Sequence, residues 1–248
     1  MKILFAVVTC HRRTYAPEAQ HHIHKNEENA HVEWVRKTWL PDAEGKVDVK
    51  FFYGGELPSS SAEPPAGDHW YSYKPDEITL PVGDDYYSLV PKVRAVIQWA
   101  YDAGYDWLLK LDDDVYVDVD KTLAGFVPAD YRGTLREGQV MQYGTSELTC
   151  KYACGPAYWL SRRAMRAILD SPIPATPYED RATGYMLIQA GIPLTESTDL
   201  MTCLCKDCLT QPRKYIQFHV EEPAWRQRFL EKHGIKPDGA LKSKLPLP

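Results

Sequence analysis

The stretch Trp107–Asp118 restricts the fold of this chain more than any other. A short apolar run leads into three consecutive carboxylates, after which β-branched and aromatic residues resume. Because the run is short and follows Gly104, a buried strand fits it better than a helix. Side chains alternate along a strand, so the sequence predicts Asp112 and Asp114 on one face and Asp113 on the other.

The three carboxylates favour a cation at the end of this strand. Like charges crowded at the end of a buried strand raise the free energy of the ionised site unless a cation is bound. Mg²⁺ and Mn²⁺ prefer oxygen ligands and commonly bind one or two carboxylates together with substrate phosphates. The stretch therefore indicates a metal–nucleotide site. From the residues alone, a solvated acidic turn is the alternative.

The composition is that of a soluble globular chain with a full core. The 248 residues are 44% hydrophobic and 25% charged, which suits one large domain or two small ones. The net charge of −5, without a basic cluster between aromatics, argues against nucleic acid as the main partner. No apolar run approaches the roughly 18 residues of a membrane span, and the first apolar run is too short for a signal peptide. We therefore expect a soluble chain without membrane insertion or an address for secretion.

Strand and helix patterns alternate along the chain and predict an α/β sandwich. In the first half, strands are expected over 2–9, 47–53, 77–82 and 107–111, and helices over 30–39 and 89–103. Pro41 is expected to end the first helix. In the second half, strands are expected over 139–144 and 216–220, and helices over 162–169, 181–190 and 224–233. Ser161 is the expected N-cap of one helix, and Gly191 ends another. Ligands of such folds bind at the carboxyl ends of the strands.

Two residues of the second half are candidates for chemistry. Asp180 begins a predicted helix after a proline-rich loop. The residues alone favour a helix cap, whereas the functional alternative is a general base beside the cation Arg181. His219 lies on a predicted strand, where most histidines are structural. It becomes a candidate Mn²⁺ ligand only if the fold brings it to Asp112 and Asp114.

Three further groups have weaker signals. Arg12, Arg13, Arg36 and Lys92 are candidates for binding a diphosphate, although each alone fits a surface charge. Four histidines crowd residues 21–31, but their spacing fits no standard metal site, and an exposed insertion fits better. Cysteines 203, 205 and 208 could be half of a zinc site or a disulfide knot. They lack a companion ligand pair, so free thiols or a local redox pair are favoured.

Six blocks of the sequence, in order, resemble the inverting β-1,3-glycosyltransferases of family 31, which include β-1,3-galactosyltransferases, β-1,3-N-acetylglucosaminyltransferases and Fringe. Lys110–Val117 matches the family pattern Lys-x-Asp-Asp-Asp-x-Phe-Val closely. Val35–Trp39 resembles Ile-Arg-x-Thr-Trp, and Glu179–Gly184 resembles Glu-Asp-Val-x-x-Gly. The remaining blocks are Phe51–Gly54, Asp85–Lys92 and Tyr152–Ser161.

The resemblance implies a GT-A fold, a UDP-sugar donor and a divalent metal, usually Mn²⁺ with Mg²⁺ as the substitute. It implies that Asp112 contacts the ribose, that Asp114 and His219 bind the metal, and that Asp180 is the catalytic base. The expected nucleotide-binding residues are Asp112, Asp113, Arg36, Lys92 and Arg12. The chain departs from the family at Arg181, where the family has Val, and at Ser88 and Val90, where it has Asn and Thr. The family's usual membrane anchor and Golgi-lumenal setting also differ from the soluble chain expected here.

The sequence therefore predicts a Rossmann-like mixed-sheet α/β/α sandwich of the GT-A type, forming a single domain over residues 1–248. Residues of about 1–118 form the expected nucleotide-binding half, and about 119–235 the half for the acceptor and the base. The expected activity is transfer of galactose or N-acetylhexosamine from a UDP-sugar to a hydroxyl of a glycan or glycosylated acceptor, with a β-1,3 linkage. The alternatives are a non-catalytic nucleotide- or carbohydrate-binding module and another metal-dependent nucleotide enzyme, such as a nucleotidyltransferase.

Overall fold

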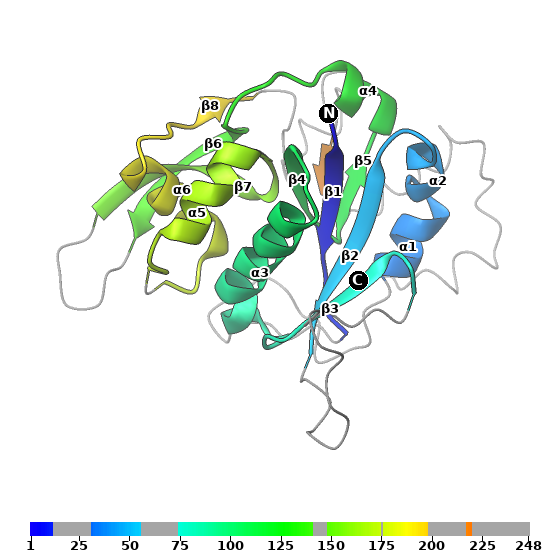
Figure 1. Ribbon diagram of the computed structural model, residues 1–248, viewed down its shortest axis with the longest axis horizontal. Helices are drawn as coiled ribbons and strands as arrows, with labels where there is room; N and C mark the ends of the chain where they lie inside the picture. The colour runs from blue at the N-terminus through cyan, green and yellow to red at the C-terminus, as the bar shows by residue number, and fades with distance from the viewer. Residues whose placement is uncertain (12–30, 56–73, 141–147, 175, 198–216, 220–248) are drawn as a thin grey trace.

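The computed structural model describes residues 1–11, 31–55, 74–140, 148–174, 176–197 and 217–219 (Figure 1). In this part of the chain one sheet has the strand order β3-β2-β1-β4-β7-β6-β8. Its strands are β1 Ile3–Val8, β2 Asp48–Gly54, β3 Glu77–Leu80, β4 Trp107–Asp112, β6 Tyr131–Val140, β7 Leu148–Ser161 and β8 Thr195–Glu196. A second, two-stranded sheet pairs β5 (Val115–Val117) with β9 (Gln217–His219).

The main sheet is mixed, and its parallel half places two strand ends side by side. β1 pairs in parallel with both β2 and β4, whereas β7 runs antiparallel to β4 and to β6. In the β1–β4 register Val8 lies opposite Asp112. The residues that follow β1 therefore meet the acidic residues that follow β4.

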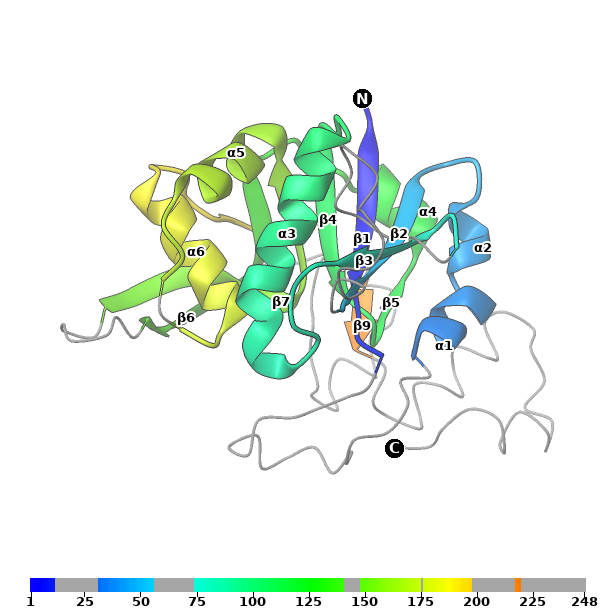
Figure 2. The same ribbon diagram turned by 60° about the horizontal axis from the view of Figure 1, so that its bottom comes forward.

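Helices cover both faces of the sheet, each over its own apolar core. Alternation along β1 sends Leu4 and Ala6 into one core and Phe5 and Val7 into the other. The first core contains residues of α3 (Leu89–Asp102), α5 (Arg162–Asp170) and α6 (Glu179–Gln189), and the second those of α1 (His31–Lys37), α2 (Leu40–Ala43) and α4 (Val119–Ala124) (Figures 1 and 2). The expected mixed-sheet α/β sandwich is confirmed.

The first half of the sandwich follows the apolar pattern closely, with one exception at Pro41. The first helix ends at Lys37, and a separate helix, α2, starts at Leu40 with Pro41 in its first turn. The prediction that Pro41 ends a helix was wrong, because the first turn needs no N–H donor from its early residues. Trp39, between the two helices, is fully buried and its indole Nε1 donates to the Val115 carbonyl at 3.1 Å.

The acidic stretch departs from the predicted alternation. β4 ends at Asp112, and the chain turns at Asp113 and Asp114 before β5 begins. The prediction that Asp112 and Asp114 share a strand face was therefore wrong, because the period of two holds only while the backbone stays extended.

The second half differs more from expectation. β6 begins at Tyr131, well before the expected strand over 139–144, of which residues 141–144 lie outside the described residues. Ser161 caps α5 as predicted, its Oγ accepting from the Ala164 N–H at 3.1 Å. α6 begins two residues early, at Glu179, and Gly191 follows it with φ +71°, as expected for a glycine after a helix. The expected helix over 224–233 lies outside the described residues. None of the helices described is long and apolar enough to cross a membrane.

Candidate functional site

A cavity of about 360 Å³ lies where the sequence placed the ligand site, at the carboxyl ends of β1 and β4. Its wall consists of residues from both halves of the chain, namely 8–10, 84–86, 110, 112–114, 152, 155 and 177–181, with Leu89 and Lys92 of α3. Seven of the lining side chains are carboxylates, and three are cations, Lys92, Lys110 and Arg181. A wall with this excess of acidic groups favours a ligand that includes a cation.

One histidine and two carboxylates gather at the turn after β4. Ligand atoms of His31, Asp113 and Asp114 all lie within 4.8 Å of one another. His31 Nδ1 is 3.5 Å from Asp113 Oδ1, and the Thr9 hydroxyl donates to Asp113 Oδ2 at 2.7 Å. Imidazole nitrogen and carboxylate oxygen are donors that suit Mn²⁺, so the residues present fit the implied metal.

The position of His31 beside these carboxylates was not predicted. Its place among four histidines suggested an exposed insertion, and the other three lie outside the described residues. α1 begins at His31, and the packing of α1 over the end of β4 brings the imidazole to the carboxylates. Only this tertiary packing distinguishes His31 from its neighbours in the sequence.

Asp112 faces a different partner from its two neighbours. Its Oδ1 accepts from Lys110 Nζ at 2.5 Å. The Lys110 side chain is 1% exposed, and burial, which alone lowers its pKa, is outweighed by Asp112 and Glu179, so that its pKa is raised. Burial raises the pKa of Asp112, Lys110 opposes this, and Asp114 adds to it. The Lys110 ammonium thus lies between two carboxylates, that of the partly exposed Asp112 and that of the buried Glu179.

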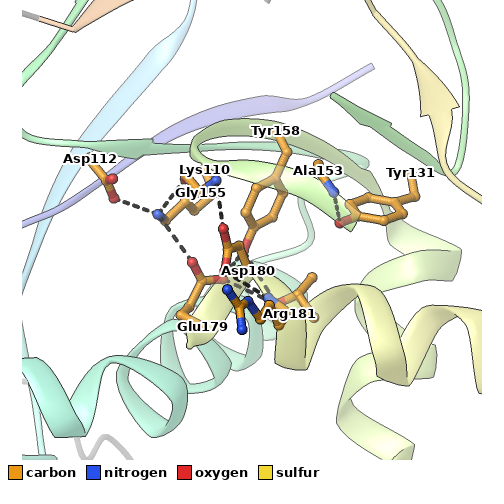
Figure 3. A network of polar contacts seen from close by, with 10 residues as sticks. Lys110, Asp112, Tyr131, Ala153, Gly155, Tyr158, Glu179, Asp180 and Arg181 are labelled. Atoms are coloured by element: carbon orange, nitrogen blue, oxygen red, sulfur yellow. Dashed lines mark hydrogen bonds and ion pairs between the residues drawn. The ribbon is translucent and has the colours of Figure 1, made fainter. Parts of the chain in front are cut away.

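Glu179, at the first position of α6, is buried and points into a closed set of donors. Lys110 Nζ lies 3.3 Å from its Oε2, the Thr183 hydroxyl donates to Oε1 at 3.1 Å, and the Tyr158 hydroxyl donates to the same oxygen (Figure 3). These contacts satisfy a carboxylate that would otherwise be costly to bury. The sequence did not predict a role for Lys110, Tyr158 or Glu179 in this network.

Asp180 lies next to Glu179 but faces the cavity. Its Oδ2 accepts from the Gly155 N–H at 3.2 Å and its Oδ1 from the Arg181 N–H at 2.8 Å. Burial, and then the charge of Glu179, raise the pKa of Asp180 to about 6, although the Arg181 N–H and Lys110 oppose this. A carboxylate with a pKa near the working pH is suited to accept a proton in a general-base step.

The remaining candidate nucleotide-binding residues lie in different places. Lys92 lines the cavity, but its Nζ donates to Asp84 Oδ1 at 2.6 Å and to the Thr9 carbonyl at 3.1 Å. Asp84 also accepts from the Gly54 N–H at 2.7 Å, so Lys92 takes part in joining α3 to the ends of β1 and β2.

Arg36 does not line the cavity. Its guanidinium contacts Asp76 at 2.5 Å and Glu77 at 2.8 Å, and it lies over the Phe51 ring. Burial alone would raise the pKa of Asp76, but the hydrogen bond and the charge of Arg36, with smaller contributions from a backbone hydrogen bond and Lys50, together hold that pKa below its ordinary value. These contacts support a role for Arg36 in joining α1 to β3 rather than in binding a ligand.

His219 is placed by its backbone alone. It pairs with Val115, the residue directly after Asp114, so β9 brings the backbone of His219 beside the acidic turn. Its role as a metal ligand stays a prediction. Arg12, Arg13 and the cysteines at 203, 205 and 208 lie outside the described residues, whereas Cys150 and Cys154 are free thiols.

No family model and no curated protein matches this chain. Among solved structures, it is similar to a glycosyltransferase involved in the glycosylation of the major capsid of PBCV-1, with 13% sequence identity, a TM-score of 0.47 and coverage of 94% of this chain and 100% of the other. It is also similar to CMP:2-keto-3-deoxy-manno-octonic acid synthetase complexed with CTP, with 12% identity, a TM-score of 0.40 and coverage of 79% and 90%. Both similarities are remote, and neither assigns a role to any residue of this chain.

Proposed function

We propose that this chain is a metal-dependent, inverting glycosyltransferase of the GT-A type, similar to those of family 31, that moves a hexose from a UDP-sugar to an acceptor hydroxyl. One observation carries the proposal. One cavity is lined by Asp113 and Asp114, which form a cluster with His31 suited to a divalent cation, and by the partly buried carboxylate of Asp180, whose pKa is raised to about 6. A binding module needs the first feature but has no use for the second.

The two halves of the chain would have different functions. Residues 1–118 would bind the nucleotide through Asp112, Asp113 and Lys92, and residues 119–235 would bind the acceptor and supply the base. Asp113, Asp114 and His31 would hold Mn²⁺ or Mg²⁺, with His219 as a further ligand on β9. When bound, the ion would stabilise the negative charge that develops on the departing diphosphate.

Asp180 would carry out the proton transfer. Its ionised carboxylate would accept the proton of the acceptor hydroxyl while the hydroxyl oxygen forms a bond to the anomeric carbon of the donor. The bond from that carbon to the diphosphate oxygen breaks with its electron pair going to UDP. Attack opposite to the leaving group inverts the configuration, by analogy with inverting glycosidases. Galactose or N-acetylhexosamine as the donor sugar and a β-1,3 linkage are the family-based form of this proposal.

One observation supports the binding module as a second candidate. Arg181 stands beside the proposed base where the resembled family has Val, and its guanidinium lies 4.2 Å from the Tyr178 ring centroid at the cavity wall. A cation at this place could bind an anionic group without turnover.

Release of UDP tests the proposal. The purified chain is incubated separately with UDP-galactose, UDP-N-acetylglucosamine and UDP-N-acetylgalactosamine, with a glycan acceptor panel, in Mn²⁺ or in EDTA. We expect UDP release from one donor in Mn²⁺ and none in EDTA. Binding of UDP without release from any donor would support the module. Release of hexose 1-phosphate would indicate a nucleotidyltransferase, because transfer of the UMP group leaves the sugar phosphate behind.

A further inference from the structure

Gly155 on β7 is hydrogen-bonded to two charged residues from different elements. Its carbonyl accepts from Lys110 Nζ at 2.8 Å, and its N–H donates to Asp180 Oδ2 at 3.2 Å (Figure 3). A Cβ added at Gly155 would lie 3.4 Å from Asp180 Oδ2, so the carboxylate packs directly against this backbone. A shift of Lys110 would therefore move the N–H that orients Asp180.

Lys110 is itself held from two sides. It is fully buried on β4, the central strand between β1 and β7, and its Nζ contacts Asp112 on one side and Glu179 on the other, at 2.5 and 3.3 Å. A buried ammonium with these three oxygen partners has all of its donors engaged. The position of the Lys110 ammonium therefore depends both on Asp112, a proposed nucleotide-binding residue, and on Glu179, the neighbour of Asp180.

Glu179 connects Lys110 to the N-terminus of α6. It is buried, and the hydroxyls of Tyr158 and Thr183 both donate to its Oε1. Because Glu179 directly precedes Asp180, any movement of Glu179 turns the start of the helix that carries Asp180.

We propose that Lys110 is a positioning residue for Asp180, acting through the backbone of Gly155, whose carbonyl accepts from Lys110 and whose N–H donates to Asp180, and that Glu179 keeps Lys110 in place. The inference deepens the proposed function, because it rests on Asp180 being the base. It assigns to a buried lysine the task of keeping the base at a fixed place relative to Asp112 across the cavity. Displacing a catalytic group by about 1 Å can lower turnover about 10²-fold.

The charges around Asp180 give the two residues opposite electrostatic effects. The titratable and charged groups that face it are Glu179 and Arg181 of α6, Lys110 of β4, Tyr86 of the short helix Tyr86–Ser88, Tyr131 of β6, and Cys150 and Tyr152 of β7. Lys110 opposes the rise in the pKa of Asp180, whereas Glu179 adds to it. Loss of the lysine charge should raise that pKa, and loss of the glutamate charge should lower it.

Three variants test the inference. Lys110→Met removes the ammonium and keeps an unbranched apolar chain, and Glu179→Gln keeps shape and acceptor while removing the charge. Arg94→Met is the matched control, because Arg94 donates to the carbonyls of Ile168, Leu169 and Ser171 and does not line the cavity. Each variant is measured for its melting temperature, for the pH dependence of kcat/KM, and by NMR for the titration of the Gly155 amide and the Asp180 carboxyl without substrate.

In the wild type we expect the Gly155 amide to titrate with the same midpoint as Asp180. Lys110→Met should lower kcat about 10²-fold, shift the Asp180 midpoint to higher pH and weaken the response of the Gly155 amide. Glu179→Gln should shift the midpoint to lower pH and also weaken the response of the Gly155 amide, because Lys110 loses its second carboxylate. This amide response decides the question if Lys110→Met does not fold. Arg94→Met should lower only the melting temperature.

The positioning role would be overturned if both groups titrated as in the wild type in Lys110→Met, or if the Gly155 amide responded as in the wild type in Glu179→Gln. If the wild type transfers no sugar, the proposed function fails, and the NMR titrations still decide the inference on their own.

Discussion

His31 Nδ1 lies 3.5 Å from Asp113 Oδ1, although the two residues belong to the first helix and to the turn after the fourth strand. The Asp113 side chain is buried, and Asp114 completes a group with ligand atoms within 4.8 Å of one another. A divalent cation bound here would balance the charges of the two carboxylates. The relationship places the candidate cation beside the carboxyl ends of the two central parallel strands.

Binding of UDP should depend on a divalent cation and on Asp114. The diphosphate of UDP and the carboxylates of the cavity would share the ion. Without it, the negative charges of the carboxylates would repel the diphosphate, so UDP should bind poorly. Calorimetry with UDP should show binding in Mn²⁺ or Mg²⁺, no binding in EDTA, and no binding by Asp114→Ala. Undiminished affinity for UDP in EDTA would refute the metal site.

The two histidines near this turn make different predictions. If His31 is a ligand, His31→Ala should weaken Mn²⁺ binding by roughly 10- to 100-fold, the usual effect of losing a group that holds or orients a metal. His219→Ala is the matched variant, since His219 lies on β9 opposite Val115. Titration of Mn²⁺ alone into both variants decides between them. Wild-type affinity in His31→Ala, with loss in His219→Ala, would exclude His31 from the site.

Asp180 should lower the stability of the protein at neutral pH. Its pKa in the folded chain is raised to about 6 by burial and by Glu179. The protonated form therefore stabilises the folded state fully below the ordinary carboxyl pKa of about 4, and this contribution is lost as the pH rises through about 6.

The variant Asp180→Asn has no carboxyl group at this position, so it does not lose stability through ionisation there as the pH rises. Without metal, the free energy of unfolding of the variant relative to wild type should rise by about 2–3 kcal/mol between pH 4 and pH 8. Urea unfolding at both pH values measures this difference, in which contributions common to the two proteins, such as that of Asp112, cancel. A difference that does not change with pH would contradict the raised pKa.

Arg36 should contribute to stability and not to nucleotide binding. Arg36→Met leaves Asp76 without its Arg36 partner and Glu77 with Lys74 alone, and it should cost about 1–3 kcal/mol, with UDP affinity unchanged. Lys46→Met is the control, because the pair of Lys46 with Asp120 is exposed and should contribute less than about 1 kcal/mol. A tenfold loss of UDP affinity in Arg36→Met without destabilisation would restore its predicted role as a nucleotide ligand.

The part of the fold that was predicted well consists of segments with a strong apolar period. The strand Ile3–Val8 and the helix Leu89–Asp102 agree with the predicted ranges to within a residue or two, because each has a continuous apolar face. β6 was largely missed, since Arg132, Arg136 and Glu137 break the alternation of a half-buried strand. Arg132 is nevertheless buried, which only its tertiary surroundings decide.

For the candidate site, too, local sequence patterns were informative, whereas contacts that depend on tertiary structure were not predicted. Asp112, Asp113, Asp114 and Asp180 line one cavity, as motif order and the rule for strand ends suggested. The partners that tune them were missed. The contact of Lys110 with Gly155 depends on the antiparallel pairing of β4 with β7, and no local pattern encodes that pairing.

The most direct test of the account is turnover by Asp180→Asn together with its affinity for the UDP-sugar. The N-cap of α6 is Tyr178, so the prediction that Asp180 caps the helix was wrong. Asn has nearly the shape of Asp, but it cannot accept the proton of the acceptor hydroxyl. We predict that kcat falls by roughly 10²–10⁴-fold while the Kd for the UDP-sugar in Mn²⁺ stays at the wild-type value. Sugar transfer at a near-normal rate by Asp180→Asn would contradict the account, because Asp180 would then not be the base.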